Sequence, residues 1–431
     1  MFSLKKEARL TKLILAVSCL LFFLLCLFSI IKYGNSTLLG SLTKFDNDDA
    51  KYIRSAWVLM DTGKLICTTP SMDTVYMMPG LSYVLAFFML IFGKFGGITA
   101  FRVFQAIIQT GSLVLVFLIA RKLFNSKVGI IAVIISFLTV ADYWVANLIL
   151  TETIFKFFVL CLVYFSIYAL EEQKTIYYIL GGLMLGLATL FRPTIAMFPI
   201  VILFIWLLKK YKVKTMFKYT VIVAAVFCVV MSPWWVRNYN IFHRFIPFTL
   251  ASGNPALQGT YINYDQSSAQ TDGLDYSQFT YPADSEIANN EVEIEIAKYR
   301  LMNLVPQYPL EFLMWYTIGK AKYQIMQPFF WHPNFLGVNT LMAAVWHGLT
   351  LLLSIFGSII YYFDKKRNKL GTLLIATIIY FIAVYLPFFT MGRYFYPAMP
   401  LVIIFAAYAV AKLAPPYRTD RPDFNVQQNR H

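Results

Sequence analysis

The chain has 431 residues, of which 59% are apolar and only 14% are charged. This composition is too apolar for a soluble protein of this length and is typical of a protein that crosses a membrane many times. The formal net charge is +15, which would suit a nucleic-acid partner. The positive residues, however, fall in short loops between apolar runs, as in the cytoplasmic loops of membrane proteins. We therefore predict no nucleic-acid binding.

Ten apolar runs are long enough to form transmembrane helices. They lie near 13–32, 101–120, 128–147, 152–170, 176–192, 194–208, 218–235, 341–362, 370–389 and 394–412. A shorter run at 79–92 is ambiguous. The predicted fold class is therefore an all-α polytopic membrane protein, with residues 1–431 forming a single integral membrane domain.

Basic loops decide how the short run is placed. Lysines and arginines concentrate before residue 13 and in the loops 121–127, 209–218 and 364–369. All four basic segments fall on one side of the membrane only if 79–92 does not cross it, and the positive-inside rule makes that side cytoplasmic. We therefore expect 79–92 to lie along, or dip into, the outer surface of the cell membrane, with both termini in the cytoplasm.

This layout leaves two long outer segments and a short inner tail. The first outer loop, 33–100, is expected to carry surface helices and candidate catalytic acids, and the second covers 236–340. Helical patterns inside these loops predict helices at 48–60, 284–303 and 309–325. The polar residues 413–431 are expected to form a cytoplasmic tail.

The most informative feature is the acidic cluster Asp46-Asn47-Asp48-Asp49 in the first outer loop. Asp46 or Asn47 can cap the helix that follows, and Asp48 and Asp49 then occupy its first turn, where the helix dipole favours negative charge. Carboxylates beside a bilayer are costly unless water, a metal ion or a cation satisfies them. The cluster is therefore a candidate reaction centre, and the alternative is a capped surface helix with solvated acids.

Five arginines depart from the positive-inside pattern, because they map to the predicted outer face near the ends of spans. They are Arg54, Arg102, Arg192, Arg237 and Arg393. A guanidinium group can hold a phosphate through two parallel hydrogen bonds. We therefore predict that these arginines bind a lipid-linked phosphate at the membrane edge. Ordinary snorkelling of arginine side chains to lipid headgroups is the alternative.

Three further residues are candidate substrate contacts: Tyr52, Asp73 and Glu152. Glu152 and Lys156 are four residues apart at the end of one predicted span, so we expect a local ion pair between them. For Asp73, the alternative interpretation is an ordinary loop carboxylate in contact with solvent. The sequence indicates no certain cofactor; a divalent cation is possible because two adjacent carboxylates can bind one, but no metal-ligand spacing identifies a site.

Several short motifs follow one another along nearly the whole chain. In order they are Asp48-Asp49-Ala50-Lys51-Tyr52, Pro79-Gly80-Leu81, Arg102, Thr151-Glu152, Arg192-Pro193, Pro233-Trp234-Trp235-Val236-Arg237 and Arg393-Tyr394-Phe395-Tyr396-Pro397. Their order resembles the glycosyltransferase C superfamily, in particular family 39, which includes protein O-mannosyltransferases and lipid A aminoarabinose transferases. The resemblance implies a glycosyltransferase C-type transmembrane bundle of about ten spans, with surface helices in its two outer loops.

The resemblance also implies an activity. Such enzymes transfer a monosaccharide, with inversion, from a polyprenyl-phosphate donor to an acceptor hydroxyl at the outer membrane face. The acceptor would be a lipid, a protein or a glycan of the cell envelope. Asp48 matches the leading acid of the family's Asp-Glu pair and would be the catalytic base, while Asp49 replaces the usual Glu. Met78-Pro79-Gly80 stands where many members have Lys-Pro-Pro, so one lysine contact to the donor is missing.

Three other classes of function stay open at this point. A polysaccharide polymerase or ligase would use diphosphate-linked glycans, and a transporter or flippase would move a lipid-linked sugar. Transporters usually place ionisable residues near the middle of the membrane, whereas the charges here gather at the predicted outer rim and the span centres look nearly bare. The last class is a relative without activity that acts as a membrane scaffold.

Overall fold

The computed structural model describes residues 4–5, 7–69, 71–282 and 285–413. Most of this part of the chain is helical. Its one sheet is an antiparallel hairpin in which β1 (Asn334–Phe335) pairs with β2 (Val338–Asn339). The predicted all-α class is confirmed. The expected tail lies outside the described residues from 414 onward.

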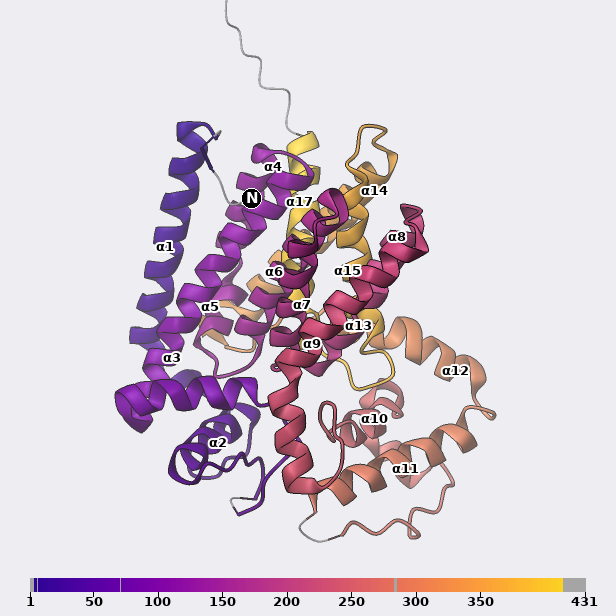
Figure 1. Ribbon diagram of the computed structural model, residues 1–431. Coiled ribbons are helices and arrows are strands. Elements are labelled where there is room, and N and C mark those ends of the chain that lie inside the picture. Colours follow the sequence, from indigo (N-terminus) through magenta and orange to yellow (C-terminus); the bar gives the residue numbers. More distant parts are fainter. Residues whose placement is uncertain (1–3, 6, 70, 283–284, 414–431) are drawn as a thin grey trace, which may run out of the picture.

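Apolar helices run between the two ends of a bundle (Figure 1). They are α1 (Arg9–Tyr33), α3 (Gly80–Leu123), α4 (Ser126–Phe137), α5 (Val140–Asn147), α6 (Glu152–Glu172), α7 (Thr175–Thr189), α8 (Pro199–Leu208), α9 (Val213–Phe242), α14 (Thr340–Phe363), α15 (Thr372–Ala383) and α17 (Met399–Leu413). α14 packs against α17, α6 against α7, and α7 against α9. One continuous apolar core extends from α1 to α17, and it holds the helices that carry the candidate site in fixed positions.

Within the described residues, six helices are long and apolar enough to span a membrane. Helices α4 and α5, bent by 59°, add a seventh span if they are counted together. The shorter apolar helical segments are Thr175–Thr189, Pro193–Leu208 and Lys369–Ala383. Each of the ten predicted spans falls on one of these segments. How many of the short segments cross completely stays a prediction, because a straight crossing needs about 20 residues.

The two ends of the bundle carry different elements. Short helices of the two long loops gather at the lower end in Figure 1, which we call the loop end. They are α2 (Asp48–Thr62), α10 (Gly253–Gly259), α11 (Glu286–Leu304) and α12 (Pro309–Met314). α12 continues through a π-helical turn, Trp315–Gly319, into α13 (Lys320–Ile325). The basic connections 121–127, 209–218 and 364–369 lie at the opposite end.

Short helices complete the chain between these elements. α16 (Gly392–Phe395) precedes α17, and the 3₁₀ helices are η1 (Gly34–Thr37), η2 (Pro193–Met197), η3 (Ile262–Tyr264), η4 (Gln266–Gln270), η6 (Lys369–Gly371) and η7 (Tyr396–Ala398). Two of them follow arginines that the sequence singled out: η2 comes directly after Arg192, and η7 begins three residues after Arg393. Their contacts therefore determine where those side chains lie.

The ambiguous run 79–92 forms the first part of α3. Gly93 breaks this helix with φ 77° and ψ 166°, a conformation that glycine adopts readily because it has no Cβ atom. In Figure 1 the part before the break lies across the loop end, whereas the part after it runs along the bundle. Because the first part does not add a pass through the bundle, the three basic connections share one end, as the charge pattern predicts.

Candidate active site

Asp48 opens α2, and the local sequence explains why the helix begins there. The Asn47 side chain accepts a hydrogen bond from the backbone N–H of Asp48 at 2.7 Å and caps the helix. At the other end Gly63 adopts φ 74° and terminates it. As the first helical residue, Asp48 keeps its side chain 52% exposed.

Two arginines and a buried glutamate meet at Asp48. Arg393, on α16, donates from Nη1 to Asp48 Oδ2 at 2.7 Å and from Nε to Glu152 Oε1. Arg192, in the turn between α7 and η2, donates from Nη2 to the same Glu152 oxygen and from Nε to Thr151 Oγ1 at 2.9 Å. Glu152 is fully buried, so it anchors both guanidinium groups. We call Asp48, Glu152, Arg192 and Arg393 the acid–arginine cluster.

Backbone features place the members of this cluster. Arg192 is extended, with φ −144° and ψ 117°, because the following Pro193 excludes the helical conformation. Glu152 begins α6, where the helix dipole stabilises its charge. Gly392 precedes Arg393, and a Cβ atom there would lie 2.0 Å from the carbonyl oxygen of Gln327. A glycine is therefore required for α16 to lie this close to the backbone of Gln327.

Both guanidinium groups keep hydrogen-bond donors that no described residue uses. Nη2 of Arg393 and Nη1 of Arg192 have no partner within the part of the chain that the structure describes. The two side chains are 11% and 13% exposed. N–H donors beside a half-exposed carboxylate can bind the oxygens of an anion such as a phosphate.

The arginines also set the protonation state of Asp48. Partial burial by itself raises the pKa of this carboxyl, but the charge and hydrogen bond of Arg393, with the charges of Lys51 and Arg192, bring its pKa below the usual value. Asp48 is therefore a carboxylate at neutral pH and can accept a proton. One turn along α2, burial and then the charge of Asp48 raise the pKa of Tyr52, so its hydroxyl stays protonated.

Asp49 differs from Asp48 in its contacts. It is fully buried, and its carboxylate accepts backbone N–H groups of Leu39 at 2.6 Å, Gly40 at 3.1 Å and Ala50 at 2.8 Å. Burial raises the pKa of Asp49 despite these hydrogen bonds, and the charge of Asp48 adds to the rise. These contacts fasten the preceding loop to the first turn of α2.

Two of the predicted phosphate ligands have other partners. Arg102 is buried and donates to the carbonyl oxygen of Asn147 and to Asn35 Oδ1, each at 2.8 Å. Arg54 lies over the ring of Phe45, 4.8 Å from its centroid, and donates to the carbonyl oxygen of a loop residue at 3.3 Å. Neither side chain hydrogen-bonds to the acid–arginine cluster.

Arg237 and Asp73 bind each other. Arg237 donates from Nη2 to Asp73 Oδ1 at 2.8 Å and from Nη1 to the carbonyl oxygen of Thr74 at 2.7 Å. This pair ties the first loop to the end of α9. The structure thus brings together Asp48, Glu152 and two of the five arginines, and it gives the other three arginines and Asp73 separate contacts.

The expected ion pair between Glu152 and Lys156 is wrong. Lys156 Nζ instead donates to Asp142 Oδ1 and to the hydroxyl of Tyr396, both at 2.8 Å. This ion pair is buried in the bundle. Glu152 faces the arginines at the start of α6, whereas Lys156 lies one turn further along the helix, deeper in the bundle. A signal for Asp142 was present in the sequence, because an ionisable residue in an apolar run marks a special site.

The cluster does not form a ready metal site. Among the described residues, no three His, Cys, Asp or Glu side chains are grouped to hold a metal ion. Asp48 and Glu152 are each paired with a guanidinium group, and Asp49 binds backbone N–H groups. The possible divalent cation therefore finds no preformed set of ligands in these residues.

An apolar pocket of about 440 Å³ lies among α6, α7, α8 and α9. Its walls include Leu185, Leu203 and Phe227, and Met197 of η2 lines it near the cluster. Because η2 begins directly after Arg192, the pocket starts within about two helical turns of that arginine. A pocket of this size and character can hold part of a hydrocarbon chain.

The fold is a helical membrane bundle of the glycosyltransferase C type, as comparisons with known proteins show. Residues 77–236 match the family described as dolichyl-phosphate-mannose-protein mannosyltransferases. This match covers less than half of the chain and contains Glu152 and Arg192 but not Asp48 or Arg393. Among curated proteins, none matches the sequence. The predicted resemblance to this superfamily is confirmed by the family match and by the fold.

Solved structures share the fold. The archaeal oligosaccharyltransferase AglB from Archaeoglobus fulgidus, in complex with an inhibitory peptide and a dolichol-phosphate, gives a TM-score of 0.54 at 15% identity, over 95% of this chain and 51% of that chain. The same organism's oligosaccharyltransferase tethered to an acceptor peptide gives 0.54 at 17% identity, over 94% and 50%. ArnT from Cupriavidus metallidurans, bound to undecaprenyl phosphate, gives only 0.42 at 15% identity, over 93% and 77%. The chain spans about half the length of the archaeal proteins.

Proposed function

We propose that this chain is a glycosyltransferase that moves a monosaccharide from a polyprenyl-phosphate donor to an acceptor hydroxyl. The acid–arginine cluster carries the proposal, because Asp48 stays a carboxylate beside two guanidinium groups whose remaining N–H donors no described residue uses. The matched family is named for a dolichyl-phosphate-linked sugar, and one AglB structure contains a dolichol-phosphate. A lipid-linked phosphate is therefore the donor class that both similarities favour.

The donor has a place for each of its parts. Its phosphate binds the N–H donors of Arg192 and Arg393 that the described residues leave unused, and its apolar tail lies in the pocket lined by η2 and α8. A hydrocarbon chain gains free energy there by leaving water or by packing against apolar side chains. The sugar then lies next to the bound phosphate, within reach of Asp48. Arg54, Arg102 and Arg237 have no part in this arrangement, because their guanidinium groups bind elsewhere.

Asp48 is the proposed general base of a single displacement. It takes the proton of the acceptor hydroxyl while that oxygen attacks the anomeric carbon, and the bond from that carbon to the phosphate oxygen breaks on the opposite face. The lipid phosphate leaves with the electron pair, so the sugar configuration inverts. Arg192 and Arg393 stabilise the negative charge that grows on the leaving phosphate.

Donor binding also prepares the base. Arg393 holds Asp48 in an ion pair at 2.7 Å, which lowers its basicity. A phosphate that takes hydrogen bonds from the same guanidinium weakens this hold, so Asp48 becomes a stronger base when the donor is present. Asp49 is proposed to position Asp48, since its carboxylate fastens the loop to the start of α2.

The active site is proposed to face the outside of the cell. The acid–arginine cluster belongs to the loop end, and the basic connections lie at the other end of the bundle. Basic loops stay in the cytoplasm during membrane insertion. The loop end is therefore assigned to the outer face of the cell membrane, where an acceptor lipid, protein or envelope glycan is available.

The rival functions need features that are weaker here. A diphosphate-linked glycan carries more negative charge than a monophosphate, and the cluster offers only two guanidinium groups, both already paired. A transporter would use the buried pair of Asp142 and Lys156, but that pair is closed by hydrogen bonds and borders a cavity of only about 30 Å³. A sugar does not fit into that volume.

Transfer of label in isolated membranes tests the proposal. Membranes with the wild-type protein, with Asp48→Asn or with Asp61→Asn are given a panel of radiolabelled polyprenyl-phosphate sugars. Asp61 is the matched control, because it lies exposed at the end of the same helix. We expect covalent transfer by wild type and Asp61→Asn and none above background by Asp48→Asn. Wild-type turnover in Asp48→Asn would refute the role of the base, and movement of label across vesicles without covalent transfer would favour a flippase.

A further inference from the structure

A buried polar network lies next to the acid–arginine cluster. Lys156 Nζ donates to Asp142 Oδ1 and to the hydroxyl of Tyr396, both at 2.8 Å, and that hydroxyl donates to Asp142 Oδ1 at 2.6 Å. Gln109 Nε2 donates to the same hydroxyl at 2.7 Å. The side chains of Lys156 and Asp142 are 2% and 8% exposed. Every charge in this network is therefore paired inside the bundle.

The network and the cluster use the same two helical segments, α6 and the continuous segment formed by α16 and η7. On α6, Glu152 belongs to the cluster and Lys156, four residues later, belongs to the network. On α16 and η7, Arg393 belongs to the cluster and Tyr396, three residues later, belongs to the network. Residues three or four apart on a helix lie one above the other, one turn apart. The two elements are thus bonded twice, at levels one turn apart.

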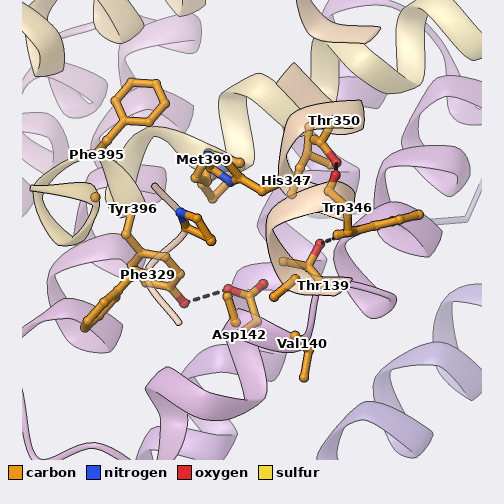
Figure 2. Close-up of a pocket in the computed structure, with 16 residues that line it drawn as sticks. Thr139, Val140, Asp142, Phe329, Trp346, His347, Thr350, Phe395, Tyr396 and Met399 are labelled. Carbon is orange, nitrogen blue, oxygen red and sulfur yellow. Dashed lines mark hydrogen bonds between the residues drawn. The ribbon is translucent and has the colours of Figure 1, made fainter. Parts of the chain in front are cut away.

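Two further helices hold the buried network in place. Asp142 comes from α5 and Gln109 from α3, and Gln109 also donates to the backbone carbonyl of Asp142 at 3.1 Å. Figure 2 shows the Tyr396 hydroxyl pointing at the Asp142 carboxylate, beside the cavity of about 30 Å³. This volume has room for one or two water molecules, so the network is not a second substrate site.

We propose that Tyr396, Lys156 and Asp142 are positioning residues of the transferase, which fix α16 against α6 and so hold Arg393 between Glu152 and Asp48. The inference rests on the proposed function. A buried ion pair does little for stability by itself, because desolvation offsets its attraction. Its partners must, however, meet in one geometry, and α16 is the first turn of the helical segment Gly392–Leu413, where a helix end frays unless contacts hold it.

Tyr396→Phe is the direct test, because it removes one hydroxyl, keeps the ring and leaves the pair of Lys156 and Asp142 intact. We expect kcat for transfer to fall by between about 10- and 100-fold, the loss typical of a displaced reacting group. The acidic limb of the pH dependence of kcat/KM should also move to higher pH, by up to about one unit, because Arg393 no longer holds Asp48 firmly. A purely structural role of the hydroxyl would leave that limb in place.

Tyr276→Phe is the matched control. The Tyr276 hydroxyl also donates to an aspartate, Asp272 at 2.6 Å, and accepts from Arg300, whose pair with Asp272 is as buried as that of Lys156 with Asp142. It lies in the second loop outside the proposed site. We expect wild-type kcat and an unshifted acidic limb. Equal effects of both Tyr→Phe changes would overturn the inference, since they would indicate general loosening of the fold.

A double replacement addresses the charged pair itself. Asp142→Leu with Lys156→Met replaces both charges by apolar groups, which preserves or raises the stability of many buried sites. We expect a folded protein, judged by thermal unfolding in detergent, with the same shift of the acidic limb. Wild-type kinetics in both this variant and Tyr396→Phe would overturn this inference but leave the proposed function standing. A wild-type protein without transfer activity would overturn the proposed function and this inference with it.

Discussion

At the scale of single residues, the fully buried Glu152 holds the candidate site together. One of its oxygens accepts hydrogen bonds from both Arg192 and Arg393. Without this negative charge, the two guanidinium groups would repel each other in a poorly solvated place. Glu152 therefore makes possible the close placement of two cations that a phosphate ligand needs.

Replacing Glu152 by Gln should reduce both stability and activity. Removing one partner of a buried charge cluster typically costs about 3–5 kcal/mol, and the arginines would no longer be held beside Asp48. Thermal or chemical unfolding in detergent and the transfer assay measure the two effects. Glu291→Gln is the control, because Glu291 and Arg244 form an exposed pair, for which the expected change is within about 1 kcal/mol. A stable and fully active Glu152→Gln protein would contradict this account.

The burial of Lys320 predicts that the stability of the fold depends on pH. It is fully buried, its Nζ donates to the carbonyl oxygen of Leu386 at 2.8 Å and lies 3.5 Å from the centroid of the Tyr316 ring, and no described carboxylate pairs with it. Burial lowers the pKa of Lys320 to about 7, whereas the unfolded chain has a lysine pKa of about 10.4. Between these values the unfolded state binds more protons, so stability rises with pH, by up to about 1.4 kcal/mol per unit.

Unfolding midpoints in detergent measured between about pH 6 and 9 test this prediction. The wild-type midpoint should be level below about pH 7 and rise above it, and Lys320→Met should abolish that rise. Lys322→Met, at an exposed position of the same short helix, should keep the wild-type profile. A rise that survives in Lys320→Met would assign the titration to another group.

At the scale of elements, α16 shows how the first turn of a long helical segment can carry a functional side chain. Its position comes from contacts outside itself: Gly392 lies against Gln327, Arg393 binds Glu152, and Tyr396 directly after it binds Asp142. Gly392 is therefore as necessary for the position of this turn as Arg393. The ends of helices fray, so the conformation of this first turn depends on these neighbours.

Gly392→Ala should displace α16. The added Cβ would lie 2.0 Å from the carbonyl oxygen of Gln327, and overpacking of this kind typically costs about 1–3 kcal/mol. We expect transfer to fall by between about 10- and 100-fold, because Arg393 moves with the helix. Gly348→Ala is the control, since a Cβ there meets nothing within 4 Å, and alanine favours the helix by up to about 1 kcal/mol. Equal activity of the two variants would contradict the prediction.

At the scale of the whole molecule, charge separates the two ends of the bundle. The basic connections share one end, and the acid–arginine cluster belongs to the other. This separation needs the break at Gly93, which turns the first part of α3 across the loop end. A straight α3 would carry that part through the membrane and reverse every later loop.

Cysteine labelling in intact cells tests the orientation. A membrane-impermeant thiol reagent should label Ser277→Cys, which lies in the second loop, and should reach Lys210→Cys only after the cells are permeabilised. The unsubstituted protein gives the background from its own cysteines, including the exposed Cys228. Labelling of Lys210→Cys in intact cells would reverse the proposed sidedness and place the active site in the cytoplasm.

The sequence by itself determined the features that depend on short stretches of chain. Apolar runs located the helical segments, Asn47 and Asp48 located the start of α2, and the basic loops indicated which ends belong together. Each follows from local physics, because hydropathy, capping and insertion charge act over a few residues. The resemblance added Asp48 as the candidate base.

Only the tertiary structure decided which charges meet. Helical spacing predicts that Glu152 and Lys156 are neighbours, but the fold pairs Glu152 with two arginines far along the chain and pairs Lys156 with an aspartate on the preceding helix. It also separated Arg192 and Arg393 from the three arginines that stabilise loops. The physical reason is that, in a poorly solvated interior, a charge must find its partner wherever the packed helices bring one, and packing joins residues hundreds of positions apart.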